Sequence, residues 1–197
     1  MGRIQTRLAY AIATFFGVGY CPVASGTAGS LATLPVAFFL TFCGGFPALV
    51  AFTVIVYIAG TFASREVLKY TNAPPISPEG EKNGGSLSKV VKTLRKEGEA
   101  ENHDPSIIVI DEVAGQMIPL TFFSVFTGVV QTDFLHWWLC IALPSFLLFR
   151  LFDITKPFPA SYFDKKVLNA HGVMLDDIVA GLYALLVMVL WVVVNRV

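Results

Sequence analysis

Acidic residues gather at the edges of apolar segments in this sequence. The pair Asp111-Glu112 directly precedes one apolar run, and the pair Asp176-Asp177 directly precedes another. Each pair would lie at a helix N-terminus, where the macrodipole favours negative charge, so either pair alone could be simple capping. Several carboxylates near a low-dielectric region raise one another's pKa or require a cation. Mg²⁺ meets that requirement because it takes oxygen ligands and leaves room for a phosphate.

The acidic pairs belong to two related pentapeptides. Residues 111–115 read DEVAG and residues 177–181 read DIVAG, so four of the five positions are identical. In each pentapeptide a glycine follows the leading aspartate by one helical turn, and a glycine there lets another helix approach closely. The pattern predicts two helices that pack tightly and present their carboxylates side by side.

A group of alternating charges ends another apolar run. Arg150 and Asp153 are three residues apart, which places them on one face of a helix. Pro157 must end that helix, so Lys156 directly before it would lie near the same interface. Either basic residue could be a positive-inside anchor. The combination of Arg, Asp and Lys also suits a phosphate held beside its metal ion.

A glycine-rich segment, residues 17–30, leads into the first apolar run with the sequence GVGYCPVASGTAGS. Gly26 and Gly29 permit close backbone approach, while Thr27 and Ser30 offer hydroxyl groups at a helix start, where anions bind. The segment is not a Walker loop, because no G-K-[ST] follows. Simple packing between a loop and a helix is an equal alternative.

Composition indicates that membrane helices position these residues. The 197-residue chain is 55% hydrophobic and 14% charged with zero net charge, against roughly 25% charged residues in soluble domains. These values exclude a disordered chain and a disulfide scaffold, and they give no electrostatic basis for a nucleic-acid partner. Three cysteines without metal-like spacing are expected to be buried in the protein: Cys21, Cys43 and Cys140.

Five segments are candidate spans, since a helix needs about 20 mostly apolar residues to cross a bilayer. They are residues 28–42, 46–63, 113–131, 134–149 and 178–194. The first is short and contains Pro35, so it could be a full span, a half-helix or a re-entrant element. We therefore predict an all-α, polytopic membrane bundle of about five spans that forms a single domain over residues 1–197.

The basic residues predict an orientation. With the N-terminus inside, the cytoplasmic segments hold thirteen of the fourteen Lys and Arg residues, as the positive-inside rule requires. The chemistry should therefore face the cytoplasm. The polar residues 71–102 are predicted to be a mobile cytoplasmic loop. On the opposite side, Trp137 and Trp138 are expected to form an interfacial aromatic belt.

Together the motifs resemble the phosphatidylglycerophosphatase A family, membrane phosphatases that make phosphatidylglycerol from its phosphorylated precursor. Four blocks match in the family's order: residues 22–30 (PVASGTAGS), 104–115 (DPSIIVIDEVAG), 150–159 (RLFDITKPFP) and 172–181 (GVMLDDIVAG). The polar stretch around residues 71–102 looks longer than the family's usual connection. The resemblance implies a multi-pass protein of the bacterial inner membrane whose substrate is the phospholipid phosphatidylglycerophosphate, and it leaves the oligomeric state open.

The resemblance also implies roles for individual residues. The Mg²⁺-binding and catalytic acids would be Asp111, Glu112, Asp153, Asp176 and Asp177. The residues around the phosphate would be Arg150, Lys156, Gly26, Thr27, Gly29 and Ser30. It does not settle which acid is a ligand, a base or a nucleophile. For the attacking group, a water activated by the metal and oriented by a carboxylate is favoured over an aspartyl-phosphate intermediate.

Two other functions use similar residues. A CDP-alcohol phosphotransferase also places aspartates at the ends of membrane helices, but its D-G-x-x-A-R block is absent from this sequence. A transporter could use the same acids as a cation site. A transporter would need those acids near the middle of the spans, whereas here they fall at one edge.

Overall fold

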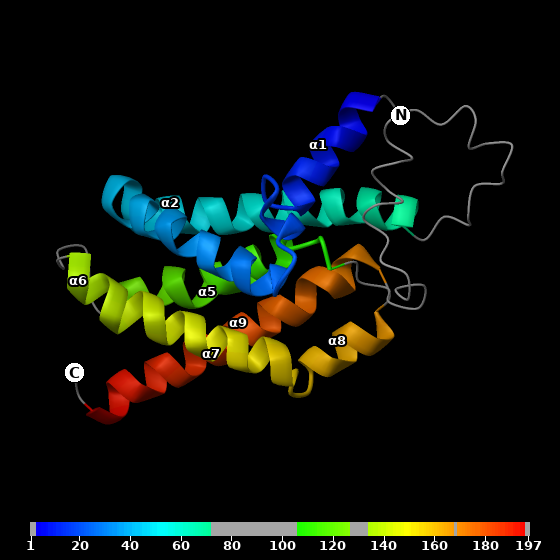
Figure 1. Ribbon diagram of the computed structural model, residues 1–197. Helices are drawn as coiled ribbons and strands as arrows, with labels where there is room; N and C mark the ends of the chain where they lie inside the picture. The colour runs from blue at the N-terminus through cyan, green and yellow to red at the C-terminus, as the bar shows by residue number, and fades with distance from the viewer. Residues whose placement is uncertain (1–2, 72–105, 127–133, 168, 196–197) are drawn as a thin grey trace, which may run out of the picture.

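The computed structural model describes residues 3–71, 106–126, 134–167 and 169–195, and these residues are helical with short connections (Figure 1). The predicted loop at 71–102 lies outside the described residues, except for Thr71. The helices are α1 (Arg3–Ala13), α2 (Ser25–Thr71), α5 (Ile110–Phe126), α6 (Phe134–Trp137), α7 (Leu143–Thr155), α8 (Ala160–Lys166) and α9 (Ala170–Asn195). A 3-10 turn, η1, covers Val18–Tyr20, and a π-helical turn, η2, covers Trp138–Ala142.

Helix α2 is a hairpin of two arms. Gly45 interrupts its helical geometry with φ 60° and ψ −153°, a backbone conformation open to glycine because it has no Cβ. The chain reverses direction there, so the second arm runs back beside the first (Figure 1). The predicted segments 28–42 and 46–63 fall on the two arms.

Within the part of the chain that the structure describes, three helical stretches are long and apolar enough to cross a membrane, judged by length and composition. They are Ser25–Lys69, Phe134–Thr155 and Ala170–Val194. The first contains both arms of α2, and the second runs from α6 through η2 into α7. Helix α5 has 17 described residues. The all-helical fold of the described residues is as predicted, and the bundle of five membrane spans stays a prediction.

Helices α5 and α9 form the centre of the bundle, and two glycines set their approach. A methyl group on Gly115 of α5 would lie 2.5 Å from the carbonyl oxygen of Asp177 on α9. On the other helix, Gly181 lies directly against the carbonyl oxygen of Gly115. The predicted tight packing of the two related pentapeptides is confirmed, and it brings the acidic first turn of α5 beside the acidic turn of α9.

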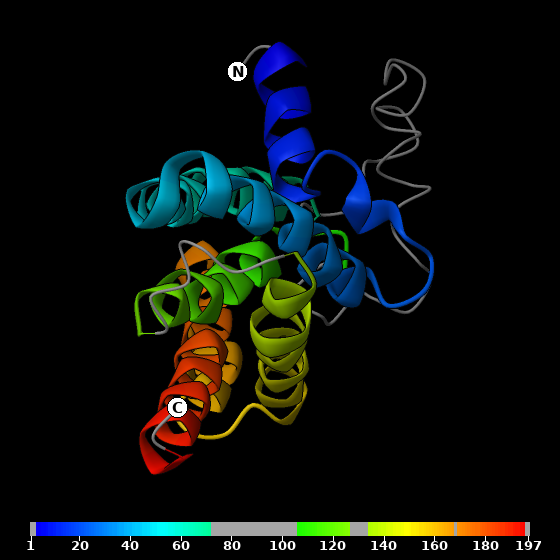
Figure 2. The same cartoon turned by 90° about the vertical axis from the view of Figure 1, so that its left-hand side faces the viewer.

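The other helices surround this pair. The α2 hairpin packs on α5, α7 and α8 pack on α9, and α1 packs against α2 while projecting from the bundle (Figures 1 and 2). Trp137 is fully buried, with its ring centroid 5.1 Å from that of Phe38. Its assignment to an interfacial belt is therefore wrong, because the ring points into the bundle. The expected burial of the cysteines is also wrong, since all three lie on outward faces of the protein.

Candidate active site

The sequence-predicted acids come from three helices that pack on one another, since α9 packs against both α5 and α7 (Figure 1). Asp111 and Glu112 lie in the first turn of α5. Helix α9 begins earlier than its apolar run indicates, because Asn169 Oδ1 accepts hydrogen bonds from the backbone N–H groups of His171 and Gly172 at 2.9 and 3.2 Å. Asp177 therefore lies about two turns inside α9. A role as an N-terminal cap therefore does not explain why a carboxylate occupies this position.

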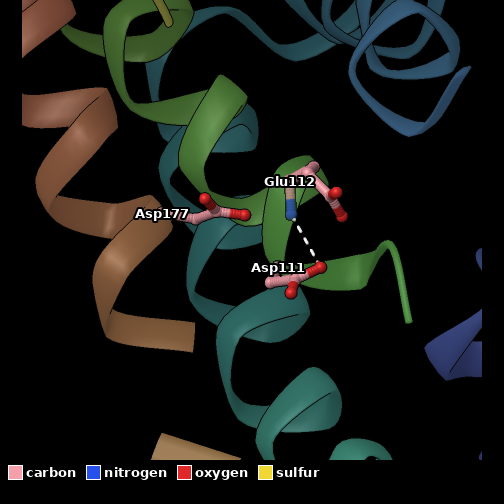
Figure 3. Close-up of side chains that lie close together, drawn as sticks. All are labelled: Asp111, Glu112 and Asp177. Carbon is pink, nitrogen blue, oxygen red and sulfur yellow. Dashed lines mark hydrogen bonds between the residues drawn. The ribbon is translucent and has the colours of Figure 1, made fainter. Parts of the chain in front are cut away.

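Three carboxylates converge between α5 and α9. One carboxylate oxygen each from Asp111, Glu112 and Asp177 lies within 4.8 Å of the other two. Figure 3 shows Asp177 reaching from α9 toward the two acids of α5, where the Glu112 backbone N–H donates to Asp111 Oδ1 at 3.0 Å. Asp111 and Asp177 are each only 4% exposed. We call these three residues the acid cluster; crowded buried carboxylates of this kind call for a counter-charge.

Arg150 and Asp153 border the acid cluster from the end of α7. Arg150 Nη1 lies 2.5 Å from Asp153 Oδ2, and the Asp153 carboxylate in turn interacts with that of Asp177. Nη1 is thus engaged by Asp153, whereas the buried Nε of Arg150 donates no hydrogen bond to a described residue. The guanidinium group therefore keeps its Nε–H available for an anion.

The start of α2 meets the same cluster through Gly26. A Cβ on Gly26 would overlap the Glu112 carboxylate and would lie 3.2 Å from Arg150 Nη1. The other predicted phosphate-binding residues of this segment are placed differently. Thr27 is half-buried in the first turn, Gly29 packs against Val109, and the buried Ser30 hydroxyl donates to the Gly26 carbonyl oxygen at 3.0 Å.

Lys156 and Asp176 form a separate group with Asp164 of α8. Lys156 Nζ lies 2.5 Å from Asp164 Oδ1 and 2.7 Å from Asp176 Oδ2. Burial alone would lower the pKa of Lys156, but the charges and hydrogen bonds of the two carboxylates outweigh burial and raise that pKa above its ordinary value. Sequence reasoning did not single out Asp164, because it follows Lys156 by eight residues across Pro157 and Pro159, at no regular helical spacing.

Replacing Gly26 by alanine should impair the site while leaving the fold intact. The added methyl group meets the far end of the Glu112 side chain, which can move aside, so the thermal unfolding midpoint should change little. Because Glu112 must then leave the cluster, we expect activity to fall about 10- to 100-fold. The measurement is phosphate release beside thermal unfolding. A large fall in the thermal unfolding midpoint alongside the loss of activity would show instead that Gly26 is needed for packing.

Carboxylates close enough to share a hard cation, beside a guanidinium group, form a site whose chemistry suits a phosphate group. The chain matches the family described as Phosphatidylglycerophosphatase A over residues 11–74 and 86–192. It belongs to that family and is a phosphatase.

Curated relatives support this assignment. The chain is 43% identical to phosphatidylglycerophosphatase A of Haemophilus influenzae over 86 residues, which is 43% of this chain and 45% of that protein. It is 28% identical to phosphatidylglycerophosphatase A of Escherichia coli over 86% of this chain and 75% of that protein. A Bacteroides thetaiotaomicron protein, provisionally named phosphatidylinositol-3-phosphatase, is 30% identical over 92% of this chain and 93% of its own length. No solved structure matches the chain.

Proposed function

We propose that this protein hydrolyses the terminal phosphate of phosphatidylglycerophosphate in an Mg²⁺-dependent reaction, giving phosphatidylglycerol and inorganic phosphate for phospholipid synthesis. The observation that carries the proposal is the acid cluster beside Arg150 and the start of α2. Family membership supports the choice of substrate.

The acid cluster has the donor set that Mg²⁺ prefers. Asp111, Glu112 and Asp177 offer three carboxylate oxygens close enough to share one ion, and a hard divalent cation takes such ligands together with phosphate oxygens and water. When bound, Mg²⁺ would neutralise charge on the transferring phosphoryl group. Asp176, predicted as a further ligand, has its Oδ2 on Lys156, so we do not include it in the proposed ligand set.

Arg150 and the start of α2 would hold the phosphate. The buried Nε of Arg150 has a donor to offer beside the Nη1 that holds Asp153, and a guanidinium group can bind two oxygens of a phosphate at once. The first backbone N–H groups of α2 have no acceptor within their own helix and favour an anion. Gly26 allows this helix start to approach Arg150 and Glu112 closely.

Asp153 would orient the attacking water. Its carboxylate contacts Arg150 and interacts with Asp177, which places it between the proposed phosphate and cation sites. Hydrolysis requires the water oxygen to bond to phosphorus in line with the ester bond that breaks. Asp153 would accept the proton of that water, and the released glycerol oxygen would take up a proton from the surrounding water. A water nucleophile thus stays our preferred alternative to an aspartyl-phosphate.

We further propose that the two arms of α2, α5, the α6–α7 stretch and α9 are the five spans, with the acid cluster at the cytoplasmic face of a bacterial inner membrane. The cluster lies at the level where α5 and α2 begin, because Asp111 and Glu112 are in the first turn of α5 and Gly26 meets Glu112, and the bias of basic residues supports that orientation. The lipid tails would stay in the bilayer while the head group enters the site. An edge position also argues against a transporter, whose cation site would lie near mid-span.

A panel of lipid phosphomonoesters tests the proposed function. Purified protein should release inorganic phosphate from phosphatidylglycerophosphate when Mg²⁺ is present, and EDTA should abolish that release. Phosphatidylinositol 3-phosphate and phosphatidic acid belong in the panel, because one relative carries the name of a phosphoinositide phosphatase. Faster release from either lipid would overturn the proposed substrate, and full activity in EDTA would overturn the proposed metal.

A further inference from the structure

A second group of charges lies beside the acid cluster and connects three elements. Lys156 follows the last residue of α7, Asp164 lies on α8, and Asp176 lies on α9. The Lys156 ammonium group bridges the two carboxylates at 2.5 and 2.7 Å. We call these three residues the lysine bracket. Asp176 is 5% exposed, whereas the Asp164 side chain is 31% exposed, so the bracket runs from the protein interior to its surface.

The lysine bracket stands next to the proposed cation ligands. Asp176 directly precedes Asp177, and the charges of Asp176 and Asp153 both act on Asp177. The Asp176 Oδ1 atom is buried and accepts no hydrogen bond from a described residue. If the Lys156 ammonium group moved toward these carboxylates, it could therefore donate a hydrogen bond to Asp176 Oδ1. Lysine can make such a move, because its compact charge sits on a flexible four-carbon chain.

We propose that Asp164 is a positioning residue that holds the Lys156 ammonium group against Asp176 and keeps it away from Asp153 and Asp177. The proposal rests on the cation site proposed above. Two carboxylates on one side of the ammonium group fix its place better than one. Without Asp164, the lysine keeps a single partner, and the remaining carboxylates attract it. An internal ammonium group among those carboxylates would compete with the divalent cation for the same negative charge.

The test is an Mg²⁺ titration of purified Asp164→Asn, a change that removes the charge and keeps the shape. Binding is followed by the Mg²⁺-induced rise in thermal unfolding midpoint, and phosphate release is measured separately. We expect the variant to need about tenfold more Mg²⁺ for half of the stabilisation, a shift of the size found between coupled neighbours. At saturating Mg²⁺ its rate should return to that of the unaltered protein. Asp164→Glu should restore the original Mg²⁺ requirement.

A matched control and a double variant separate positioning from general structural support. Glu66→Gln also removes one carboxylate from a lysine, since Glu66 Oε1 lies 2.6 Å from Lys69 Nζ on α2; it should leave the Mg²⁺ requirement unchanged. Adding Lys156→Met to Asp164→Asn removes the competing charge and should bring the Mg²⁺ requirement back to the original value or below. A shift that persists in the double variant would overturn the proposal.

The titration also distinguishes failure of this proposal from failure of the proposed function. Stabilisation of the unaltered protein by Mg²⁺, with no shift in Asp164→Asn, would overturn the role of Asp164 alone. No stabilisation of the unaltered protein would overturn the cation site and the role of Asp164 together. Stabilisation that shifts as expected, without hydrolysis of phosphatidylglycerophosphate, would support the role of Asp164 and contradict the proposed substrate.

Discussion

Asp177→Asn is expected to lower phosphate release about 10³-fold, the loss typical of removing one preorganised charge from a water-poor site. Asp177 is 4% exposed and supplies the single acid-cluster carboxylate that α9 contributes. Without it, the acids of α5 would have to hold a divalent cation alone. The measurement is kcat at saturating substrate over a range of Mg²⁺ concentrations. Recovery of full activity at high Mg²⁺ would contradict an essential role for this carboxylate.

The same variant should unfold at a higher temperature than the unaltered protein when no divalent cation is present. Asp177 lies among the carboxylates of Asp153, Asp111 and Asp176, and removing one charge relieves their mutual repulsion. Added Mg²⁺ should then stabilise the variant less than the unaltered protein. Glu66→Gln, which alters a carboxylate outside the cluster, serves as the control. A variant that is both inactive and less stable would indicate misfolding in place of a lost ligand.

Arg150→Lys is expected to lower kcat/KM about 10²-fold although it keeps the positive charge. The guanidinium group offers donors in a fixed planar fork, whereas an ammonium group is a single point charge that cannot bind two phosphate oxygens in the same way. Asp153, 2.5 Å from Arg150 Nη1, should retain a cationic partner in the variant. Steady-state kinetics on phosphatidylglycerophosphate, together with inhibition by inorganic phosphate, measure the effect.

The exposed Arg65 on α2 provides the matched control for Arg150. Arg65→Lys makes the same chemical change outside the site and should leave kcat/KM unaltered. We expect Arg150→Lys to weaken inhibition by phosphate while leaving Mg²⁺-induced stabilisation intact, since Arg150 is assigned to the anion and not to the cation. Unchanged phosphate inhibition would remove Arg150 from the proposed phosphate site.

The central packing of the fold was predictable from short-range spacing. One-turn separation of aspartate and glycine in DEVAG and DIVAG indicates both the close approach of two helices and the meeting of their acids. The structure has both features, in the contacts of Gly115 and Gly181 and in the acid cluster. The spacing of residues along a helix determines which side chains share a face, so such features can be predicted from the sequence alone.

Features that depend on contacts between distant elements were not predictable. The start of α9 at Ala170 is different, because its signal is local: Asn169 caps the helix through residues two and three positions on, and this places Asp176 and Asp177 in the helix interior. Lys156 pairs with Asp164 and Asp176 because the chain turns back after α7, and no periodicity encodes that turn. Trp137 is buried against Phe38, and the direction of its side chain depends on how α6 and η2 pack on α2. Composition indicates a membrane helix but does not say which of its faces is covered.

The most direct test of the central claim is a crystal structure of the protein grown with Mn²⁺ in place of Mg²⁺, with the metal located by its anomalous scattering. We expect a single strong peak within bonding distance of Asp111, Glu112 and Asp177. A peak elsewhere in the bundle, or none at the acid cluster in crystals of catalytically active protein, would contradict the claim.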